Sequence, residues 1–270
     1  MLKKFLKGSQ APDPQSKPKE SEEILEEQID AGIKEFKRSN RNLFVSAFTA
    51  GLEIGFSVLL MGTLYSLFVG KVSPESMSLL LAISYPIGFI FVIIGRSELF
   101  TEHTALALLP VLNGSVTLRN LLILWTIVYV GNIIGGLLFT LLLVQIGPSV
   151  GFIQVDSFYH LAKKMVDYDW NTILFSALLA GWMMGLLGWL VTSSKETVSR
   201  IFVIILITSV IGLAGLHHCI VGSIEVLAGL ITSDKISMLD YVKFQTWATI
   251  GNVLGGTIFV AVLKFGQIRI

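Results

Sequence analysis

Charged residues are scarce in this chain, and cysteine is almost absent. Asp, Glu, Lys and Arg make up 14% of its 270 residues, against about 25% in a soluble globular domain. The single cysteine, Cys219, has no partner within the chain for a disulfide and no second thiol for a metal site. A formal net charge of +1 gives no reason to expect nucleic acid as a partner. Composition thus excludes a disulfide scaffold and a strongly basic nucleic-acid-binding domain.

The first 20 residues lack the apolar core of about 7–15 residues that a cleavable signal peptide needs. We therefore expect the first membrane span to direct insertion. Pro, Ser, Lys and Gln dominate residues 8–20, and such a composition buries too little apolar surface to fold. Residues 1–20 are predicted to be a disordered polar tail.

Residues 21–42 are predicted to form a cytoplasmic amphipathic helix that begins at Ser21. The stripe on its buried face has a spacing of three to four residues and comprises Ile24, Leu25, Gln28, Ile29, Ile33 and Phe36. Its polar face is more acidic than basic, which favours packing against protein over binding to anionic lipid.

Hydrophobic residues are abundant, at 53% of the chain, and the mean hydropathy is +0.74. About 20 apolar residues cross the hydrocarbon core of a bilayer as a helix. Runs of at least about that length occupy 43–69, 79–112, 121–146, 173–191, 202–231 and 245–263. We predict an all-α membrane protein with six transmembrane helices in residues 43–265, followed by a short tail at 266–270.

Two of these runs, 79–112 and 202–231, are too long for one span and carry ionisable residues in the middle. The first contains Arg96, Glu98, Glu102 and His103, and the second contains His217, His218 and Glu225. Each charge costs about 2.5–3.5 kcal/mol at the centre of a membrane helix, so these segments must be buried in protein or line a wet cavity. We predict that the second and fifth spans are broken, with Arg96 paired to Glu98 or Glu102 rather than selecting anions.

A short internal repeat relates the two halves of the chain. Gly131-Asn132-Ile133-Ile134-Gly135-Gly136 recurs 120 positions later as Gly251-Asn252-Val253-Leu254-Gly255-Gly256. Because each half holds three predicted spans, an odd number, the second half enters the membrane from the opposite side and gives an inverted repeat. The glycine spacing favours close helix packing, and Asn132 and Asn252 are expected to hold the broken segments by hydrogen bonds.

The second interruption places His217 and His218 next to each other among small residues. Adjacent side chains do not share one face of a helix, so we expect one imidazole to face a pathway and the other to face packing. The ordinary histidine pKa of about 6.5 suits proton exchange with a weak acid. A metal site that adds His103 and Glu102 is a rival, but no spaced ligand motif supports it. Phe100, in the first interruption, either gates the pathway or only packs.

These residues together resemble the formate/nitrite transporter family over residues 24–265. The resemblance is carried by Glu98-Leu99-Phe100-Thr101, Gly131-Asn132, Gly251-Asn252 and Gly215-x-x-His218. It implies an aquaporin-like protomer in a homopentamer within the lipid bilayer of the bacterial inner membrane, each subunit passing small monovalent anions such as formate, nitrite or hydrosulfide, or the conjugate weak acids.

The same resemblance implies roles for individual residues. His218 is the pore histidine, Leu99 and Phe100 line a constriction, and Thr101 hydrogen-bonds toward His218. Either Lys163 or Lys164 resembles a vestibule lysine that attracts anions. His217 stands where the family typically has an acidic residue and Gly222 where it has Asn, which suggests the YfdC-like branch of the family.

The distribution of basic residues predicts that both termini are cytoplasmic. One side has nine, Lys34, Lys37, Arg38, Arg41, Arg119, Lys195, Arg200, Lys264 and Arg269, and the other has five, Lys71, Lys163, Lys164, Lys235 and Lys243.

Two alternatives to an anion channel stay open, a pore for a neutral solute and a non-conducting sensor that recruits a partner through residues 21–38. An enzyme is not expected, because no nucleophile–base pair, cofactor loop or metal-ligand spacing is visible. For the same reason we expect no cofactor.

Overall fold

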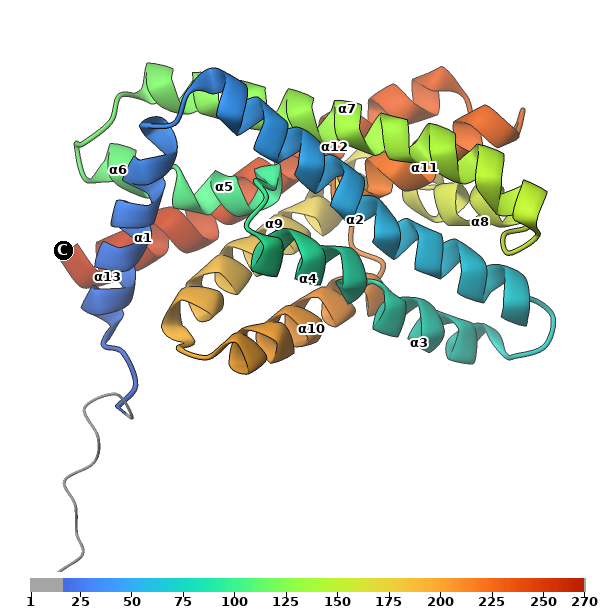
Figure 1. The fold of residues 1–270 in the computed structure, drawn as a ribbon, viewed down its shortest axis with the longest axis horizontal. Helices are drawn as coiled ribbons and strands as arrows, with labels where there is room; N and C mark the ends of the chain where they lie inside the picture. The colour runs from blue at the N-terminus through green and yellow to red at the C-terminus, as the bar shows by residue number, and fades with distance from the viewer. Residues whose placement is uncertain (1–16, 270) are drawn as a thin grey trace, which may run out of the picture.

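The computed structural model describes residues 17–269, and most of them are helical (Figure 1). In chain order the helices are α1 Ser21–Phe36, α2 Asn40–Phe68, α3 Pro74–Ser84, α4 Pro86–Gly95, α5 Phe100–Leu106, α6 Leu109–Leu112, α7 Leu118–Val150, α8 Val155–Val166, α9 Trp170–Ser193, α10 Thr197–Leu213, α11 Val221–Thr232, α12 Met238–Gly256, the π-helix η3 Thr257–Val262 and α13 Leu263–Arg269. No strand occurs in this part of the chain.

Five helical stretches are long and apolar enough to cross a membrane. They are Asn40–Phe68, Pro74–Gly95, Leu118–Val150, Trp170–Ser193 and Met238–Arg269. The remaining predicted run, 202–231, is divided between the shorter helices α10 and α11, with a non-helical segment at 214–220. A second non-helical segment separates α4 from α5 at 96–99. Both segments fall inside the runs whose ionisable residues predicted a break.

Local sequence sets several helix ends. The hydroxyls of Ser39, Ser73 and Thr117 each accept a hydrogen bond from the backbone N–H three residues on, and these N-caps start α2, α3 and α7. Ser237 forms a reciprocal capping box with Asp240 at the start of α12. At its other end α7 stops at Gly151, whose φ of +87° is the left-handed conformation that glycine adopts without strain.

Glycines bring two pairs of long helices into backbone contact. A Cβ atom added to Gly135 of α7 would lie 2.1 Å from the Phe48 carbonyl oxygen of α2, and one added to Gly255 of α12 would lie 2.1 Å from the Leu178 carbonyl oxygen of α9. Only glycine allows these crossings. The pairs α2–α7 and α9–α12 therefore pack in the same way, through glycines 120 positions apart.

Helix α1 packs against its own chain, on α6, α9, α5 and α13. Ile24, Leu25 and Ile29 of its predicted stripe are buried there. In Figure 1, α1 and α13 lie at one end of the bundle, hereafter the terminal end, and α8 lies toward the opposite end, hereafter the α8 end.

Several predicted boundaries need correction. Helix α1 begins at Ser21, as predicted, but it ends at Phe36 and not at residue 42. Helix α2 begins at Asn40, so residues 40–42 belong to it, and residues 266–269 continue α13 where a tail was predicted. Helix α8 was missed because its 12 residues are too few to span a membrane, although its buried side chains, which include Phe158, Leu161 and Met165, have the spacing of an amphipathic helix. Of the predicted tail at 1–20, residues 1–16 lie outside the described residues.

Candidate functional site

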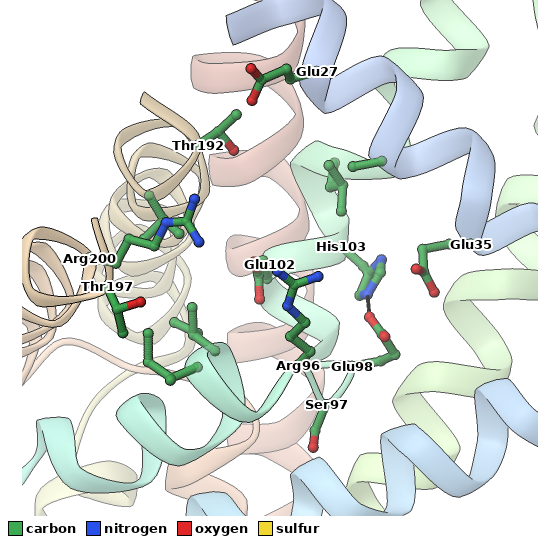
Figure 2. A pocket seen from close by; sticks show the side chains of 15 residues that line it. Glu27, Glu35, Arg96, Ser97, Glu98, Glu102, His103, Thr192, Thr197 and Arg200 are labelled. Atoms are coloured by element: carbon green, nitrogen blue, oxygen red, sulfur yellow. Dashed lines mark hydrogen bonds and ion pairs between the residues drawn. The ribbon is translucent and has the colours of Figure 1, made fainter. Parts of the chain in front are cut away.

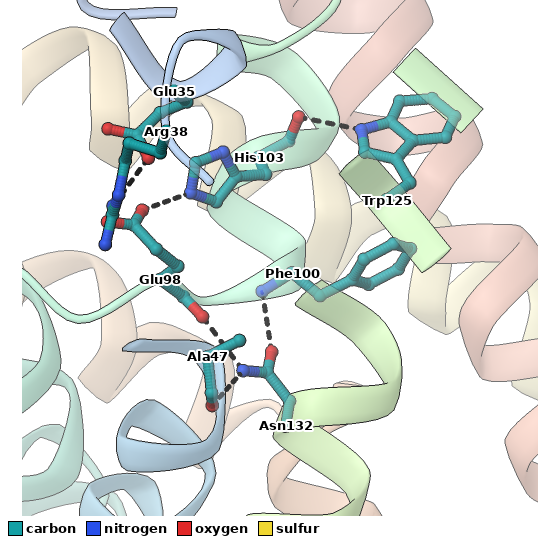
Figure 3. Close-up of polar contacts among 8 residues, drawn as sticks. All are labelled: Glu35, Arg38, Ala47, Glu98, Phe100, His103, Trp125 and Asn132. Carbon is teal, nitrogen blue, oxygen red and sulfur yellow. Dashed lines mark hydrogen bonds and ion pairs between the residues drawn. The ribbon is translucent and has the colours of Figure 1, made fainter. Parts of the chain in front are cut away.

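The first helix break is held by the side chain of Asn132 on α7. Its Oδ1 accepts the backbone N–H of Phe100 at 2.8 Å, and its Nδ2 donates to the carbonyl oxygens of Glu98 and Ala47, both at 2.8 Å. Figure 3 shows this amide between the loop and helix α2. The loop's backbone groups are thus paired without a helix, as a buried non-helical segment requires.

The second break is held in the same way by Asn252 on α12. Its Oδ1 accepts the backbone N–H of Cys219 at 2.8 Å, and its Nδ2 donates to the carbonyl oxygens of His217 and Ala177, at 3.0 Å and 2.7 Å. Each asparagine therefore forms hydrogen bonds with the residues before and after one central position. That position is Leu99 in the first break and His218 in the second, and both side chains are buried.

His218 joins the two breaks. Its Nε2 lies 2.8 Å from the Thr101 hydroxyl, which is carried by α5 just after the first break. Its Nδ1 accepts the backbone N–H groups of Ile220 and Val221, both at 3.3 Å. A ring nitrogen that accepts hydrogen bonds carries no proton, so the imidazole is neutral and Nε2 holds the proton. Nε2–H then donates to Thr101, whose own hydroxyl proton stays available to another acceptor.

Apolar side chains surround this hydrogen bond. The Phe89 ring of α4 meets the His218 ring edge-on, with centroids 5.3 Å apart. Leu99 is fully buried. The Phe100 ring packs edge-on against Tyr129 and Trp125 of α7, at 5.0 Å and 6.4 Å between centroids. Phe100 is thus packed in this structure, whereas Thr101 and His218 are the polar groups that face each other.

His217, the neighbouring histidine, turns to a different partner. Its Nδ1 lies 2.8 Å from the Ser176 hydroxyl of α9, which also accepts the His217 backbone N–H at 3.2 Å. The rings of Tyr168 and Phe244 flank its imidazole. The two histidines therefore diverge, as adjacent residues must. Ser176 was not singled out from the sequence, because a lone hydroxyl in an apolar run carries no pattern.

An ion-pair cluster ties the first break to the chain between α1 and α2. Glu98 pairs with Arg38 and with Nε2 of His103, and Arg38 also pairs with Glu35 at 2.6 Å. Burial lowers the pKa of Arg38, but the hydrogen bonds that it donates to Glu35 and Glu98, and the charges of these carboxylates, outweigh burial and leave the pKa raised. Figure 3 shows Glu98 between Arg38 and His103.

The predicted ion pair of Arg96 with Glu98 or Glu102 is wrong. Among residues 17–269 neither carboxylate lies within 4.0 Å of the Arg96 guanidinium. Arg96 ends α4 in the left-handed conformation, with φ of +60°, and its side chain is exposed. This turn directs Arg96 away from Glu98. Glu98 pairs instead with His103 of α5 and with Arg38 of the α1–α2 connection.

A cavity of about 470 Å³ opens at the terminal end. Figure 2 shows two cations, Arg96 and Arg200, and the carboxylates Glu27, Glu35, Glu98 and Glu102 around it. Both signs of charge are thus present at this mouth. No group of three or more His, Cys, Asp or Glu side chains within residues 17–269 has the proximity of a metal site, so His103 and Glu102 do not assemble with His217 and His218 as ligands.

Lys163 and Lys164 lie on α8, at the opposite end. Lys163 sits 3.7 Å from Asp167 and is half exposed. Lys164 lines a separate cavity of about 240 Å³, together with Glu225 and the loop residues Gly215 and Leu216. Only Lys164 therefore faces the second break.

Two carboxyl groups within the apolar helices had no predicted role. Glu53 was not singled out from the sequence, and Glu225 was noted only as an interruption of an apolar run. Glu53 of α2 has one buried oxygen without a partner in the described structure, and it lies beside Gly95 at the end of α4. Glu225 of α11 is 5% exposed. Each is the one acidic residue in an apolar helix, and one acidic residue does not change the hydrophobic pattern of a span. A lone carboxyl group within an apolar run was the feature of the sequence that could have indicated a role for Glu53 and Glu225.

The long apolar helices and the two buried helix breaks define a multi-pass helical membrane protein. The chain belongs to the formate/nitrite transporter family, whose model matches residues 22–266. It is 32% identical over 242 residues to the inner membrane protein YfdC of Escherichia coli strain K12, covering 88% of this chain and 76% of that one.

Two solved structures share the fold. An FNT family ion channel superposes with a TM-score of 0.79 at 21% identity, covering 90% of this chain and 98% of the other. A pentameric formate channel with formate bound superposes with a TM-score of 0.72 at 18% identity, covering 86% and 98%. The family expected from the motifs is thus confirmed.

Proposed function

We propose that this protein is a membrane channel or transporter that passes a small monovalent anion, such as formate, nitrite or hydrosulfide, or its conjugate acid, through a pore centred on His218. The observation that carries the proposal is the 2.8 Å contact between His218 Nε2 and the Thr101 hydroxyl, which joins the two helix breaks. Membership of the formate/nitrite transporter family supports it, as does the likeness to a formate channel with formate bound.

The chemistry of this pair suits a compact solute with an oxygen or sulfur acceptor. With His218 Nε2–H donated to Thr101, the threonine proton points to whatever acceptor enters between the breaks. Leu99, Phe89 and the packed Phe100 exclude water and leave few other polar partners. Such a passage favours a solute that sheds its hydration easily or crosses as a neutral acid.

The wider architecture belongs to the same proposal. It has six spans in two inverted three-helix repeats, with α4–α5 and α10–α11 as the broken second and fifth spans. Such a repeat explains why Asn132 and Asn252 make corresponding hydrogen bonds to the two breaks. The same proposal includes an aquaporin-like protomer in a homopentamer, and the likeness to a pentameric formate channel supports the pentamer. The larger count of basic residues at the terminal end supports an orientation with this end in the cytoplasm.

A pore for a neutral solute is the second candidate, favoured by the neutral tautomer of His218 and the apolar side chains around it. A sensor that recruits a partner through α1 has less support, because the apolar stripe of α1 is already buried against its own chain.

Flux measurements in liposomes test the proposal. The full-length protein is reconstituted, and uptake of labelled formate, nitrite and hydrosulfide is compared between wild type and His218→Asn at acidic and neutral pH. We expect wild-type flux for at least one of these anions and its loss in the variant. His160→Asn, which removes an exposed histidine paired with Asp156 on α8, is the matched control. Equal flux in wild type and His218→Asn refutes the central role of His218.

A further inference from the structure

Glu225 is a carboxyl group with no role in the pore described above. It lies on α11, two helical turns beyond His218, and is 5% exposed. Among residues 17–269 its carboxyl group makes no hydrogen bond and has no ion-pair partner within 4.0 Å. A buried carboxyl without partners is expensive to keep in a protein, so its presence calls for a ligand or a proton.

The side chain of Glu225 faces the cavity of about 240 Å³ at the α8 end. The floor of this cavity is the α10–α11 break, at Gly215 and Leu216, and Lys164 reaches it from α8. The cavity therefore lies between the outside of the bundle and the loop that carries His218. A solute that enters from this end meets an ammonium group and a carboxyl group before it reaches the apolar constriction.

Few charges act on Glu225. Lys164 of α8 is the charged side chain whose field reaches it. The other titratable groups on the cavity wall are the phenols of Tyr85 and Tyr168. Tyr241 of α12 faces the same helix but bonds to Ser223, at 3.0 Å, and Lys163 lines the neighbouring pocket beside Asp167.

An ionised carboxylate in such surroundings is stable only when a cation compensates it, and Lys164 is the available cation. The same lysine also attracts an anionic solute. When an anion engages Lys164, the lysine no longer compensates Glu225, and the carboxyl is most stable with its proton. When the anion leaves, Lys164 compensates a carboxylate again. Lys164 thus couples the charge of Glu225 to the presence of an anion.

We propose that Glu225 is the proton donor that neutralises a weak-acid anion in this cavity before the solute enters the constriction; the proposal rests on the transport function proposed above. The O–H bond of the Glu225 carboxylic acid breaks, and an O–H or S–H bond forms on the anion held by Lys164. Glu225 is left as a carboxylate beside Lys164, and when the next anion engages Lys164 it takes up a proton from a hydronium ion on the α8 side, which leaves water. The neutral acid then passes Leu99, Phe89 and neutral His218.

With Glu225 as the proton donor, His218 and Glu225 have different tasks. His218, whose Nδ1 is occupied by two backbone N–H groups, holds its proton on Nε2 and orients the Thr101 hydroxyl. Glu225, which no neighbour holds by a hydrogen bond, supplies and regains the proton. The pore is then selective for anions of weak acids, because the anion of a strong acid does not accept a proton from a carboxylic acid.

Flux of formate by the full-length protein in liposomes tests the proposal, with Glu225→Gln as the variant. Glutamine keeps the size of the side chain but has no acidic proton. At neutral pH we expect formate flux to fall by about 100-fold, the lower end of what a positioned proton donor contributes, and to recover toward acidic pH, where solution supplies formic acid. Flux of formamide, a neutral solute of similar size, is expected to stay unchanged.

Asp156→Asn is the matched control, because Asp156 is an exposed carboxylate of α8 outside the Glu225 cavity. Infrared difference spectra give a second readout without transport. Adding formate to the wild type is expected to produce a protonated-carboxyl C=O band that Glu225→Gln lacks.

The outcomes separate the two proposals. If wild type carries formate and Glu225→Gln has the same flux and pH profile, the role of Glu225 is overturned while the transport function stands. If wild type carries none of the tested anions but formate still produces the infrared band, the transport function fails and the proton site stands. If neither flux nor band responds, both are overturned.

Discussion

The side chain of Asn132 makes the same three hydrogen bonds to the first helix break that the side chain of Asn252 makes to the second. In each case one amide oxygen accepts a loop N–H, and one amide nitrogen donates to a loop carbonyl and to a carbonyl of a neighbouring long helix. Two residues 120 positions apart thus fix Leu99 and His218 at corresponding places.

Replacing Asn252 with Ala leaves the Cys219 N–H and the carbonyl oxygens of Ala177 and His217 without partners. Each buried polar group left unpaired costs about 1–3 kcal/mol, so we expect the variant to be destabilised by about 3 kcal/mol or more and to lose solute flux. Unfolding of the purified protein in detergent measures the first effect. Asn113→Ala, which removes an exposed amide bonded only to Ser115, is the control, and similar losses in both variants would argue against a special role for Asn252.

Much of this arrangement follows from the sequence for physical reasons. Apolar runs of about 20 residues have few solutions in a bilayer, and ionisable residues such as Glu98 and His218 in mid-run force a break. The repeated Gly-Asn pairs then mark where the broken segments are held. These signals depend on composition and spacing, which the sequence displays directly.

The pairing of individual side chains does not follow in the same way. Arg96 and Glu98 are two residues apart, and spacing favoured their ion pair. The left-handed turn at Arg96 separates them, and Glu98 instead meets Arg38, which is 60 positions away. Glu225 looks like an isolated defect in an apolar helix until α8, also unpredicted, brings Lys164 to the same cavity. Such contacts depend on tertiary packing, which local pattern does not encode.

The ion-pair cluster gives a prediction that separates Glu98 from Arg96. Glu98→Gln leaves Arg38 and His103 without their shared carboxylate, and removing one partner of a buried pair costs about 3–5 kcal/mol. Because Arg38 and Glu98 are partly exposed, we expect a loss of about 1–3 kcal/mol, seen as a lower unfolding temperature in detergent. Arg96→Gln should change that temperature little. A larger loss from Arg96→Gln than from Glu98→Gln contradicts the pairing described here.

The helix crossings predict a steric effect on stability. In Gly255→Ala the new methyl group meets the Leu178 carbonyl oxygen at 2.1 Å and the Trp182 backbone nitrogen at 2.6 Å, and neither backbone atom can move without separating α9 from α12. Overpacking costs about 1–3 kcal/mol when neighbours adjust, and we expect the upper end of that range. Gly95→Ala is the comparison, because its Cβ meets only the flexible Glu53 side chain, at 3.8 Å. Equal unfolding temperatures for the two variants would refute the close crossing.

The contact between His218 and Thr101 predicts coupling between two substitutions. Thr101→Val keeps the shape of the side chain and removes the hydroxyl, while His218→Asn removes Nε2. If both act through one hydrogen bond, the double variant loses less than the sum of the single losses, by about 1 kcal/mol in the free energy of activation for flux. Rates of formate uptake in liposomes for the four proteins give the cycle. Strictly additive losses would show that the two groups act separately.

Lys164 and Lys163 are neighbours on α8, yet the structure assigns them different effects on flux. Lys164 lines the cavity above the second break, whereas Lys163 lies beside Asp167, whose carboxylate offsets its charge. Lys164→Gln should therefore lower anion uptake at low ionic strength by about tenfold, mainly by raising the solute concentration for half-maximal flux, and Lys163→Gln should have a much smaller effect. The difference should shrink as salt screens the ammonium group.

Lys164→Arg, which keeps the charge, should restore uptake. Failure of this rescue would mean that Lys164 acts through its shape or through proton exchange and not through its electric field. Unchanged uptake when both lysines are neutralised would remove α8 from the permeation pathway altogether.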